Sequence, residues 1–303
     1  MISLLLTMAL GGLVGFVLRT YRISLLSVFI QLVICLLLFF LGLELGADRM
    51  LLDKIGTLGL QAGAITLGAM TGSLILVAMI DRLFFKEFKK NTLFEQTQAK
   101  HWGFVKNSVS IIICFMAGLI CAIISRFTSS ITSDIVLGLL YILLFLVGIS
   151  IGKENKALCS IKQQGYRIFL LPAGTLIGTL VGAAIAGWLL PHMRIWDSMA
   201  IGSGMGYYSL SSVLLSHSKG AEISSIALLS NILRELLTLF TAPLLIKTFG
   251  KLAPISAGGV TSMDITLPVI IRFSGKEYAV LAIFHGAILD PLVPVLVGFF
   301  GSI

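Results

Sequence analysis

Eight apolar runs, each long enough to cross a membrane as a helix, constrain the fold of this chain more than any other feature. They cover about residues 2–18, 23–43, 55–80, 107–124, 135–152, 168–190, 223–246 and 278–300. A helix needs about 20 apolar residues to cross roughly 30 Å of hydrocarbon. Only 12% of the 303 residues are charged and 57% are hydrophobic, and a soluble domain could not bury so much apolar surface. The sequence therefore predicts a polytopic all-α membrane protein, and it excludes a soluble enzyme, a secreted disulfide scaffold and a nucleic-acid-binding protein.

Two further apolar stretches, residues 200–217 and 256–273, are interrupted by Gly, Ser, Thr and Pro. Such residues are unfavourable in a helix that faces lipid, because the protein itself must satisfy every backbone polar group inside the bilayer. We expect these stretches either to cross as discontinuous helices or to enter and return as re-entrant hairpins. The chain would have ten spans in the first case and about eight in the second.

The basic residues predict the orientation, because Lys and Arg mark the cytoplasmic loops of membrane proteins. With eight spans, two hairpins and an external N-terminus, 16 of the 22 Lys and Arg residues lie on the inner side and five lie outside, while Arg234 falls within a helix. Both chain ends are therefore expected outside (N-out, C-out), and ten spans would leave both ends there. The basic loop 85–106 also contains aromatic residues, and we expect it to lie on anionic lipid rather than to bind nucleic acid.

The first two thirds of the chain contain an internal repeat at an offset of 106 in the numbering. The segment 37–46 (LLFFLGLELG) aligns with 143–152 (LLFLVGISIG), and six of the ten glycines in the segment 1–84 fall on glycines of the second copy. Each copy holds three spans, an odd number, so the second copy would be inverted relative to the first, as in many secondary transporters. Similar glycine-rich helix interfaces without a duplication are the alternative.

A weaker repeat in the last third, at an offset of 55, pairs Ser209 with Asp264 and Glu235 with Asp290. If each unit is one hairpin and one helix, the second is again inverted and the two hairpin tips would meet near the membrane midplane. The predicted organisation is a first three-helix repeat (1–84), a cytoplasmic basic loop (85–106), a second, inverted three-helix repeat (107–196) and a substrate- or ion-binding core with two broken helices (197–303).

Five ionisable residues lie in or beside the expected spans: Glu44, Arg234, Glu235, Asp264 and Asp290. A charge inside a membrane costs roughly 2.5–3.5 kcal/mol on insertion scales, so each of them needs a reason. Arg234 and Glu235 could form a structural ion pair or contact a neighbouring helix, or Glu235 could serve transport. Glu44 could serve transport or lie at the outer membrane surface, and Asp290 could serve transport or help to accommodate the two prolines of its helix.

Asp264 is the strongest candidate. The segment GGVTSMD places Gly259, Thr261 and Ser262 just before it, and Pro268 follows. A broken helix exposes N–H groups at one half-helix end and carbonyls at the other, which suit an anionic group and a cation respectively. The carboxylate adds a titratable charge. The alternative is that Asp264 caps a helix.

The matching segment GSGMGYYS offers Tyr208 and Ser209 but no charge, while Asn231 shares a helix face with Glu235. These residues complete the predicted substrate- or proton-binding site.

The four cysteines show no CxxC spacing, and the chain has neither a His/Cys cluster nor a Walker motif. We therefore predict no metal site and no cofactor.

Four motifs in the last third carry a resemblance to a known family. They are Gly206-Tyr207-Tyr208-Ser209-Leu210-Ser211, Ala227 to Glu235 (ALLSNILRE), Gly259 to Pro268 (GVTSMDITLP) and the segment from His285 to Pro294. With these motifs, the last third resembles the LysO family of bacterial lysine exporters, while the first two thirds match only in the layout of spans and in an LxxFFxG element. Members usually have Trp where this chain has Tyr207, and an acid at position 290 is not expected.

The resemblance implies a transporter, not an enzyme, that exports L-lysine and toxic lysine analogues through the bacterial inner membrane. It also implies eight spans with both ends outside. The acidic residues of the family's NxxRE and TSMD motifs correspond to Glu235 and Asp264.

Export of lysine requires energy, because its net positive charge moves outward against about 2.3 kcal/mol per 100 mV of inside-negative potential. We expect proton antiport with alternating access. Asp264 and Glu235 would alternately hold the ε-ammonium or protons, since burial favours a protonated carboxyl and a bound cation favours the carboxylate. The hydroxyls of Ser209, Thr261 and Ser262, with half-helix N–H groups, would hold the α-carboxylate.

A sodium/proton antiporter or an organic-anion carrier on the same architecture is the main alternative, because buried carboxylates suit cation exchange equally well. An intramembrane aspartyl protease is a remote one, since Asp264 and Asp290 could form a pair but the chain lacks a GxGD motif. The sequence leaves the oligomeric state open, a homo-oligomer included.

Overall fold

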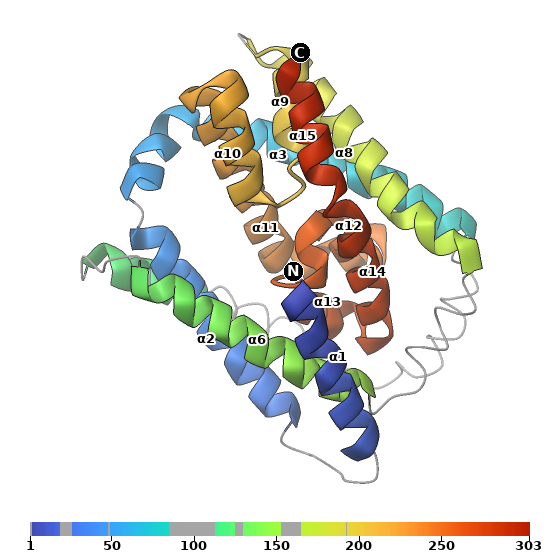
Figure 1. Ribbon diagram of the computed structural model, residues 1–303. Coiled ribbons are helices and arrows are strands. Elements are labelled where there is room, and N and C mark those ends of the chain that lie inside the picture. The colour runs from blue at the N-terminus through green and yellow to red at the C-terminus, as the bar shows by residue number, and fades with distance from the viewer. Residues whose placement is uncertain are drawn as a thin grey trace. The chain divides into compact units, whose positions relative to one another are not determined.

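The computed structural model describes residues 2–18, 26–47, 49–84, 113–124, 130–152, 165–191 and 193–303. Every element in these ranges is helical (Figure 1). The helices are α1 (Ile2–Val17), α2 (Leu26–Ala47), α3 (Arg49–Phe84), a helix Ile113–Ile124, α6 (Ser130–Gly152), α8 (Leu170–Leu189), α9 (Ile195–Gly202), α10 (Tyr208–Lys219), α11 (Ala221–Phe249), α12 (Ala253–Gly258), α13 (Leu267–Ser274), α14 (Ala279–Leu289) and α15 (Leu292–Ser302), with 3-10 turns η2 (Gly165–Phe169), η3 (Gly259–Met263) and η4 (Lys276–Tyr278). The predicted all-α class is confirmed for the described residues.

Four helices of the described residues are long and apolar enough to cross a membrane. They are Leu58–Leu83, Arg167–Leu189, Ala221–Phe249 and Lys276–Ser302. Large apolar side chains point outward from them, such as Leu60 at 85% exposed and Trp188 at 73% exposed, which is the surface that lipid would cover. The chain is thus a helical membrane protein. The number of crossings and their orientation stay predictions, and the basic loop 85–106 lies outside the described residues.

The chain divides into two compact units, of which the first comprises Met1–Leu52 and Gln98–Ser160. Its helices approach through glycines. A Cβ atom on Gly11 or Gly15 of α1 would overlap backbone atoms of α6, and a Cβ atom on Gly118 would overlap the backbone of α2. Close backbone approach of this kind is how helices associate where water gives no hydrophobic driving force.

The second unit comprises Asp53–Thr97 and Ile161–Ile303. Within it α3 and α8 cross at Gly72 and Gly178, and a Cβ atom on either glycine would overlap the carbonyl oxygen of the other. The hydroxyl of Thr66 donates to the carbonyl of Ser230 at 2.9 Å and so joins α3 to α11. Helix α8 also packs against α9, α12 and α14.

The first interrupted stretch is a helical hairpin. Helix α9 ends at Gly202, a turn of residues 203–207 follows, and α10 returns (Figure 1). An ion pair between Lys219 Nζ and Asp197 Oδ1 at 2.9 Å holds the base of this hairpin, because it joins the end of α10 to the start of α9.

The second interrupted stretch is a hairpin as well, with α12 and η3 as one arm and α13 as the other. At its base the hydroxyl of Ser274, at the end of α13, donates to the carbonyl of Lys251, just before α12, at 2.8 Å. Lys251 Nζ also lies 4.0 Å from Glu277 Oε1. Both stretches thus fold back as hairpins, and their entry into a membrane and return stays a prediction.

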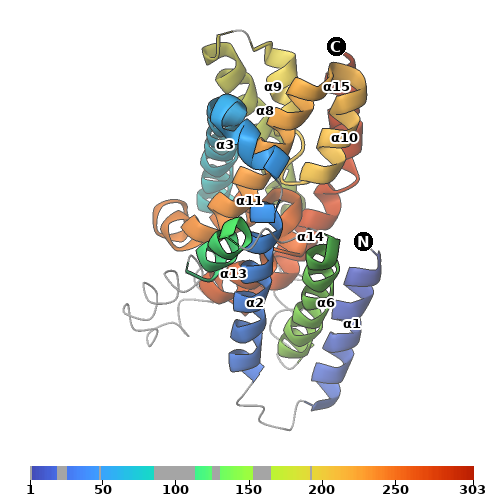
Figure 2. The same ribbon diagram turned by 90° about the vertical axis from the view of Figure 1, so that its left-hand side faces the viewer.

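The hairpins meet tip to tip. Helix α11 begins beside the base of the first hairpin and ends beside the base of the second, and its 29 residues span about 43 Å. The bases therefore lie at opposite ends of the second unit (Figure 1 and Figure 2). At the tips, Val260 N donates to the carbonyl oxygen of Met205 at 3.0 Å. Met205 is buried with a φ of 45°, a conformation that non-glycine residues rarely adopt.

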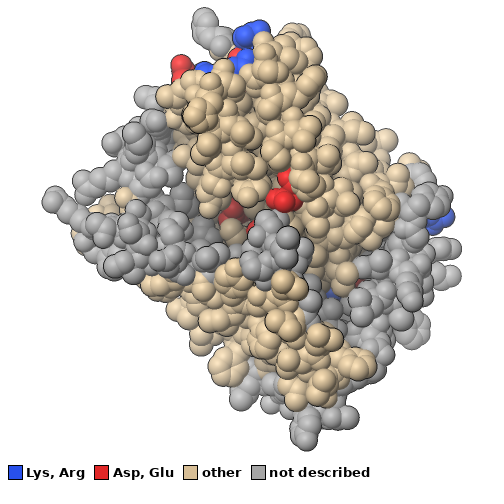
Figure 3. Space-filling model, in the orientation of Figure 1, with Lys and Arg blue, Asp and Glu red and all other residues tan. Residues whose placement is uncertain are grey.

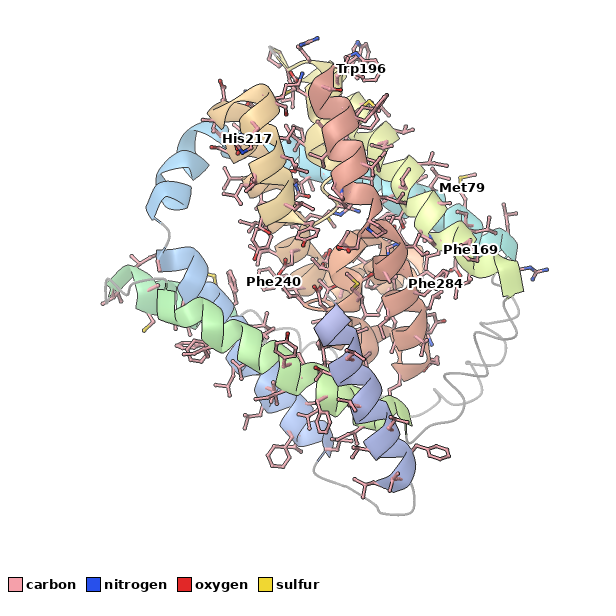
Figure 4. The ribbon with its side chains drawn as sticks, viewed as in Figure 1. Met79, Phe169, Trp196, His217, Phe240 and Phe284 are labelled. Atoms are coloured by element: carbon pink, nitrogen blue, oxygen red, sulfur yellow. The ribbon has the colours of Figure 1, made fainter. Side chains whose placement is uncertain are left out.

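Aromatic contacts hold the last two helices onto different neighbours. Phe284 of α14 packs edge-on against Phe169, just before α8, with ring centres 5.1 Å apart (Figure 4). Phe300 of α15 stacks on Trp196 of α9 with ring centres 6.1 Å apart. Accordingly α14 lies on α8 and η3, whereas α15 lies on α9 and α10.

The tip contact makes a glycine necessary at position 259. Gly259 has φ 61° and ψ −125°, and a Cβ atom there would overlap the carbonyl of Met205. We expect Gly259→Ala to lower the free energy of unfolding by about 2 kcal/mol or more, from backbone strain and the overlap. Thermal unfolding of purified protein in detergent measures the change.

Gly298→Ala is the matched control, because Gly298 lies in α15 and nothing lies within 4 Å of its built Cβ. Alanine there should be neutral or stabilise by up to about 1 kcal/mol. Equal effects of the two substitutions would contradict the tip geometry.

Candidate functional site

Asn231 of α11 fixes the turn of the first hairpin. Its Oδ1 accepts from the backbone N–H of Gly206 at 2.8 Å, and its Nδ2 donates to the carbonyl of Ile201 at 3.2 Å. Nδ2 also lies 3.3 Å from Ser211 Oγ and 2.9 Å from the carbonyl of Ala227. One buried side chain thus holds the end of α9 and the turn that leads into α10, and we assign it a positioning role.

Arg234, one turn further along α11, holds the second hairpin. It is 2% exposed. Its Nε donates to the carbonyl of Ala257 at 2.9 Å and its Nη2 to the carbonyl of Ser256 at 3.1 Å. Both Nη atoms lie 3.2 Å from the hydroxyl of Thr179 in α8. The cation therefore stabilises the carbonyl end of α12, where the helix dipole is negative.

Of the two roles that the sequence left open for Arg234, the structure has the contact to neighbouring helices. The guanidinium forms no ion pair within the described residues, and helix-end carbonyls take its hydrogen bonds instead.

His285 connects the second hairpin to α8. Its Nδ1 lies 3.0 Å from Ser262 Oγ, and its Nε2 lies 2.9 Å from Thr175 Oγ1. The hydroxyl of Thr175 donates in turn to Ser256 Oγ at 3.0 Å. Both ring nitrogens of this fully buried histidine are therefore hydrogen-bonded.

Asp264 follows the tip of the second hairpin directly, after η3. Its Oδ1 accepts from the N–H of Ile265 at 2.6 Å, and its own N–H donates to the carbonyl of Thr261 at 3.1 Å. Thr266, not Asp264, occupies the N-cap position of α13. The carboxylate is thus presented at the junction of the two hairpins and is not the cap of α13.

The hydroxyls near the tips differ in what they can bind. Thr261 Oγ1 donates to the carbonyl of Gly258 at 2.9 Å, and Ser262 Oγ donates within the hairpin to Gly259 at 2.7 Å. Ser209, in the first turn of α10, is exposed, and its hydroxyl forms no hydrogen bond within the described residues. Tyr208 precedes it and is half-buried.

Asp290 joins the site from the break between α14 and α15. It interacts electrostatically with Asp264 and with Tyr207. Tyr207 and Asp290 are the two positions at which the sequence departs from the pattern that it resembles, and they interact electrostatically with one another. Neither Asp264 nor Asp290 forms an ion pair within the described residues.

Glu235 and Glu44 are the remaining acidic residues of the predicted site. Glu235 is buried in α11, at 3% exposed, one turn beyond Asn231. Glu44 lies in α2 of the other unit, and its side chain is outside the described residues.

Two carboxylates, those of Asp264 and Asp290, lie at this junction, and neither pairs with a cation in the part of the chain that the structure describes. In Figure 3 acidic atoms are visible near the middle of this face among uncharged residues, while Lys and Arg atoms lie at the top and at the right edge. Within the described residues no group of three or more His, Cys, Asp or Glu side chains could hold a metal ion. Carboxylates of this kind can bind an ammonium group or a proton.

Sequence reasoning missed the threonines of α8. Thr175 and Thr179 are one turn apart on a helix otherwise made of apolar and small residues. This spacing was the signal in the sequence that both hydroxyls lie on one face of the helix. What they bind depends on which helix packs against α8, and residue spacing does not encode that.

The fold and site define a class of protein, a helical membrane transporter built around two opposed hairpins. More specifically, the family model described as lysine exporter LysO matches residues 5–95 and 112–301, and the chain belongs to this family.

Two curated relatives agree with that assignment. The chain is 30% identical over 307 aligned residues to a protein of Escherichia coli (strain K12) named lysine exporter LysO, and the match covers 100% of both chains. It is 35% identical over 162 residues to a protein of Haemophilus influenzae named putative lysine exporter, which covers 53% of this chain and 80% of the relative. No solved structure matches.

The Arg234 contacts make a testable prediction. We expect Arg234→Met to lower the free energy of unfolding by about 2–4 kcal/mol, because the carbonyls of Ser256 and Ala257 lose charged donors in a buried place. Reversible unfolding of the purified protein in mixed detergent micelles measures this difference.

Lys247→Met makes the same exchange of a cation for methionine at an exposed position of the same helix. It should stay within about 0.5 kcal/mol of the parent. A loss as large as that of Arg234→Met would show that helix-end binding is not the cause.

Proposed function

We propose that this chain exports L-lysine and lysine analogues from the cytoplasm by proton antiport with alternating access. The observation that carries the proposal is the junction of two opposed hairpins, where Asp264 has no ion-pair partner within the described residues. Membership of the lysine exporter family and the names of the two relatives support lysine as the substrate.

The energetics of lysine export explain why the proposed site contains acidic residues. Lysine carries a net positive charge, and an inside-negative membrane drives it inward by about 2.3 kcal/mol per 100 mV. A passive pore would therefore import it, so export needs a coupled ion. We assign this role to the proton, which competes with an ammonium group for the same carboxylate. No other cofactor is part of the proposal.

In the proposed complex Asp264 and Glu235 alternately hold the ε-ammonium of lysine or protons. The α-carboxylate is held by hydroxyls and half-helix N–H groups near the tips. Of the three hydroxyls, Ser209 is the best placed, because it donates no hydrogen bond within the described residues, whereas Thr261 and Ser262 donate to backbone carbonyls. Gly259, Tyr208 and Asn231 shape the tips.

Inverted repeats are part of the proposal, and contacts between equivalent positions support them. Gly72 and Gly178, which are equivalent in the first repeat pair, contact one another reciprocally. Met205 and Val260, which are equivalent in the second repeat pair, form the tip hydrogen bond. A two-fold axis that relates two repeats brings equivalent residues together only where it passes between them, so one such contact is expected for each repeat pair.

We place the protein in the bacterial inner membrane with eight spans and both chain ends outside. Each hairpin returns to the side from which it starts, so neither adds a crossing. The uneven distribution of Lys and Arg supports this orientation.

Flux through proteoliposomes tests the function. Purified protein is reconstituted in vesicles loaded with radiolabelled lysine. The vesicles should release the lysine when a proton gradient that drives protons inward is imposed. Asp264→Asn should lower the initial rate at least about tenfold, because the amide neither holds an ammonium with its charge nor exchanges a proton. Glu222→Gln, which removes an exposed acid in the first turn of α11, should leave the rate unchanged.

Two results would count against the proposal. Lysine release that needs a sodium gradient, with no response to protons, would assign the site to another coupled carrier. Normal export by Asp264→Asn would remove the carboxylate from the mechanism.

A further inference from the structure

We propose that Asp290 binds the α-ammonium group of the substrate. With the ε-ammonium held by Asp264 and Glu235, the site then selects substrates that carry both ammonium groups. This inference rests on the proposed function, because it assumes that lysine occupies the hairpin junction. Asp290 would then determine the specificity of the site. The alternative role for this residue is only to help its helix accommodate two prolines.

The packing of the last two helices puts Asp290 between the hairpins. Helix α14 lies on η3 and α13 of the second hairpin, and α15 lies on α9 and α10 of the first. Asp290 and Pro291 form the joint between α14 and α15. A side chain at this joint can therefore face a ligand held by both tips, just as α11 contacts both hairpins from its own side.

The carboxylate of Asp290 lacks the partners that a buried acid normally has. Its Oδ1 is buried and accepts no hydrogen bond within the described residues. No cation pairs with it there. Buried polar atoms are nearly always hydrogen-bonded, so an exception calls for a ligand or water. The remaining surface of the residue is partly accessible, so a ligand can reach it.

The backbone adds to the negative potential at the joint. Pro291 has no N–H, so it cannot donate to the carbonyl of Ala287, and Pro294 likewise cannot donate to the carbonyl of Asp290. The carboxylate and these two carbonyls both favour a positively charged group.

An ammonium group fits this place better than a metal ion. A metal ion needs several ligands in a defined geometry, and no group of three candidate side chains exists in the described residues. An ammonium group offers three hydrogen-bond donors that can be shared between a carboxylate, a carbonyl and a hydroxyl. When both are ionised, the carboxylates of Asp264 and Asp290 repel one another, and a ligand with two ammonium groups would neutralise both.

The α-ammonium is the one that Asp290 can reach. In an amino acid the α-ammonium and the α-carboxylate share one carbon, so the groups that bind them must be neighbours. Tyr207 interacts electrostatically with both acids, and the effect of Asp290 is the larger. Tyr207 stands just before Tyr208 and Ser209, and the hydroxyl of Ser209 is the one proposed for the α-carboxylate. The ε-ammonium is left for Asp264 and Glu235.

Competition by a lysine analogue tests the assignment directly. The probe is 6-aminohexanoate, which keeps the ε-ammonium and the carboxylate of lysine and lacks only the α-ammonium. Inhibition of radiolabelled lysine flux by unlabelled lysine and by 6-aminohexanoate is measured in proteoliposomes with the membrane potential clamped at zero. For the unaltered chain we expect lysine to inhibit at least about tenfold more strongly than 6-aminohexanoate.

In Asp290→Asn this preference should fall to about twofold or less, through weaker binding of lysine, while inhibition by 6-aminohexanoate stays unchanged. Asp290→Glu keeps the charge and should keep most of the preference. Glu222→Gln serves as the control for loss of an acid and should retain the full ratio.

Several results would overturn the assignment. One is an unaltered preference for lysine over 6-aminohexanoate in Asp290→Asn. If this variant changes only the response to the proton gradient, Asp290 serves the proton instead. Another is an unaltered chain that transports lysine without preferring it over 6-aminohexanoate, a test that needs no variant to fold. Failure of the unaltered chain to transport lysine at all would instead overturn the proposed function on which this inference rests.

Discussion

The hydrogen bond between the two hairpin tips is the contact on which the rest of the second unit depends. For Val260 N to reach the carbonyl of Met205, both stretches must break and turn back within the unit. Position 259 must be glycine, and Met205 must accept a positive φ. Strain of this kind persists only where neighbouring structure holds it. Here the neighbours are α11 on one side and the joint of α14 and α15 on the other.

Helix α11 supplies that support with two polar residues placed one turn apart. Asn231 satisfies the backbone at the first tip and Arg234 satisfies it at the second. In a membrane protein such broken ends cannot rely on bulk water, so side chains must take over the unsatisfied groups. Two polar residues of α11 thus hold the protein itself, and in the proposed function Asp264 and the exposed Ser209 are available to a ligand.

The sequence predicted what local chemistry determines. Glycine and proline in the two stretches predicted the breaks, and the acid after Thr-Ser-Met predicted which side chain the second tip would present. It could not predict that Arg234 binds the carbonyls of Ser256 and Ala257 rather than Glu235. That choice depends on how α11 is rotated against α12, and helical spacing gives the rotation of one helix but not its partner. The same limit concealed Thr175 and Thr179.

The contacts between positions that are equivalent in the proposed repeats would have a mechanical consequence. In the proposed alternating access, each repeat would take up the conformation that its mate had before. A contact between two equivalent residues maps onto itself in that exchange, so it can persist while the surrounding contacts change. Gly72 with Gly178, and Met205 with Val260, are contacts of this kind. In that mechanism they would act as pivots about which the helices on either side exchange positions.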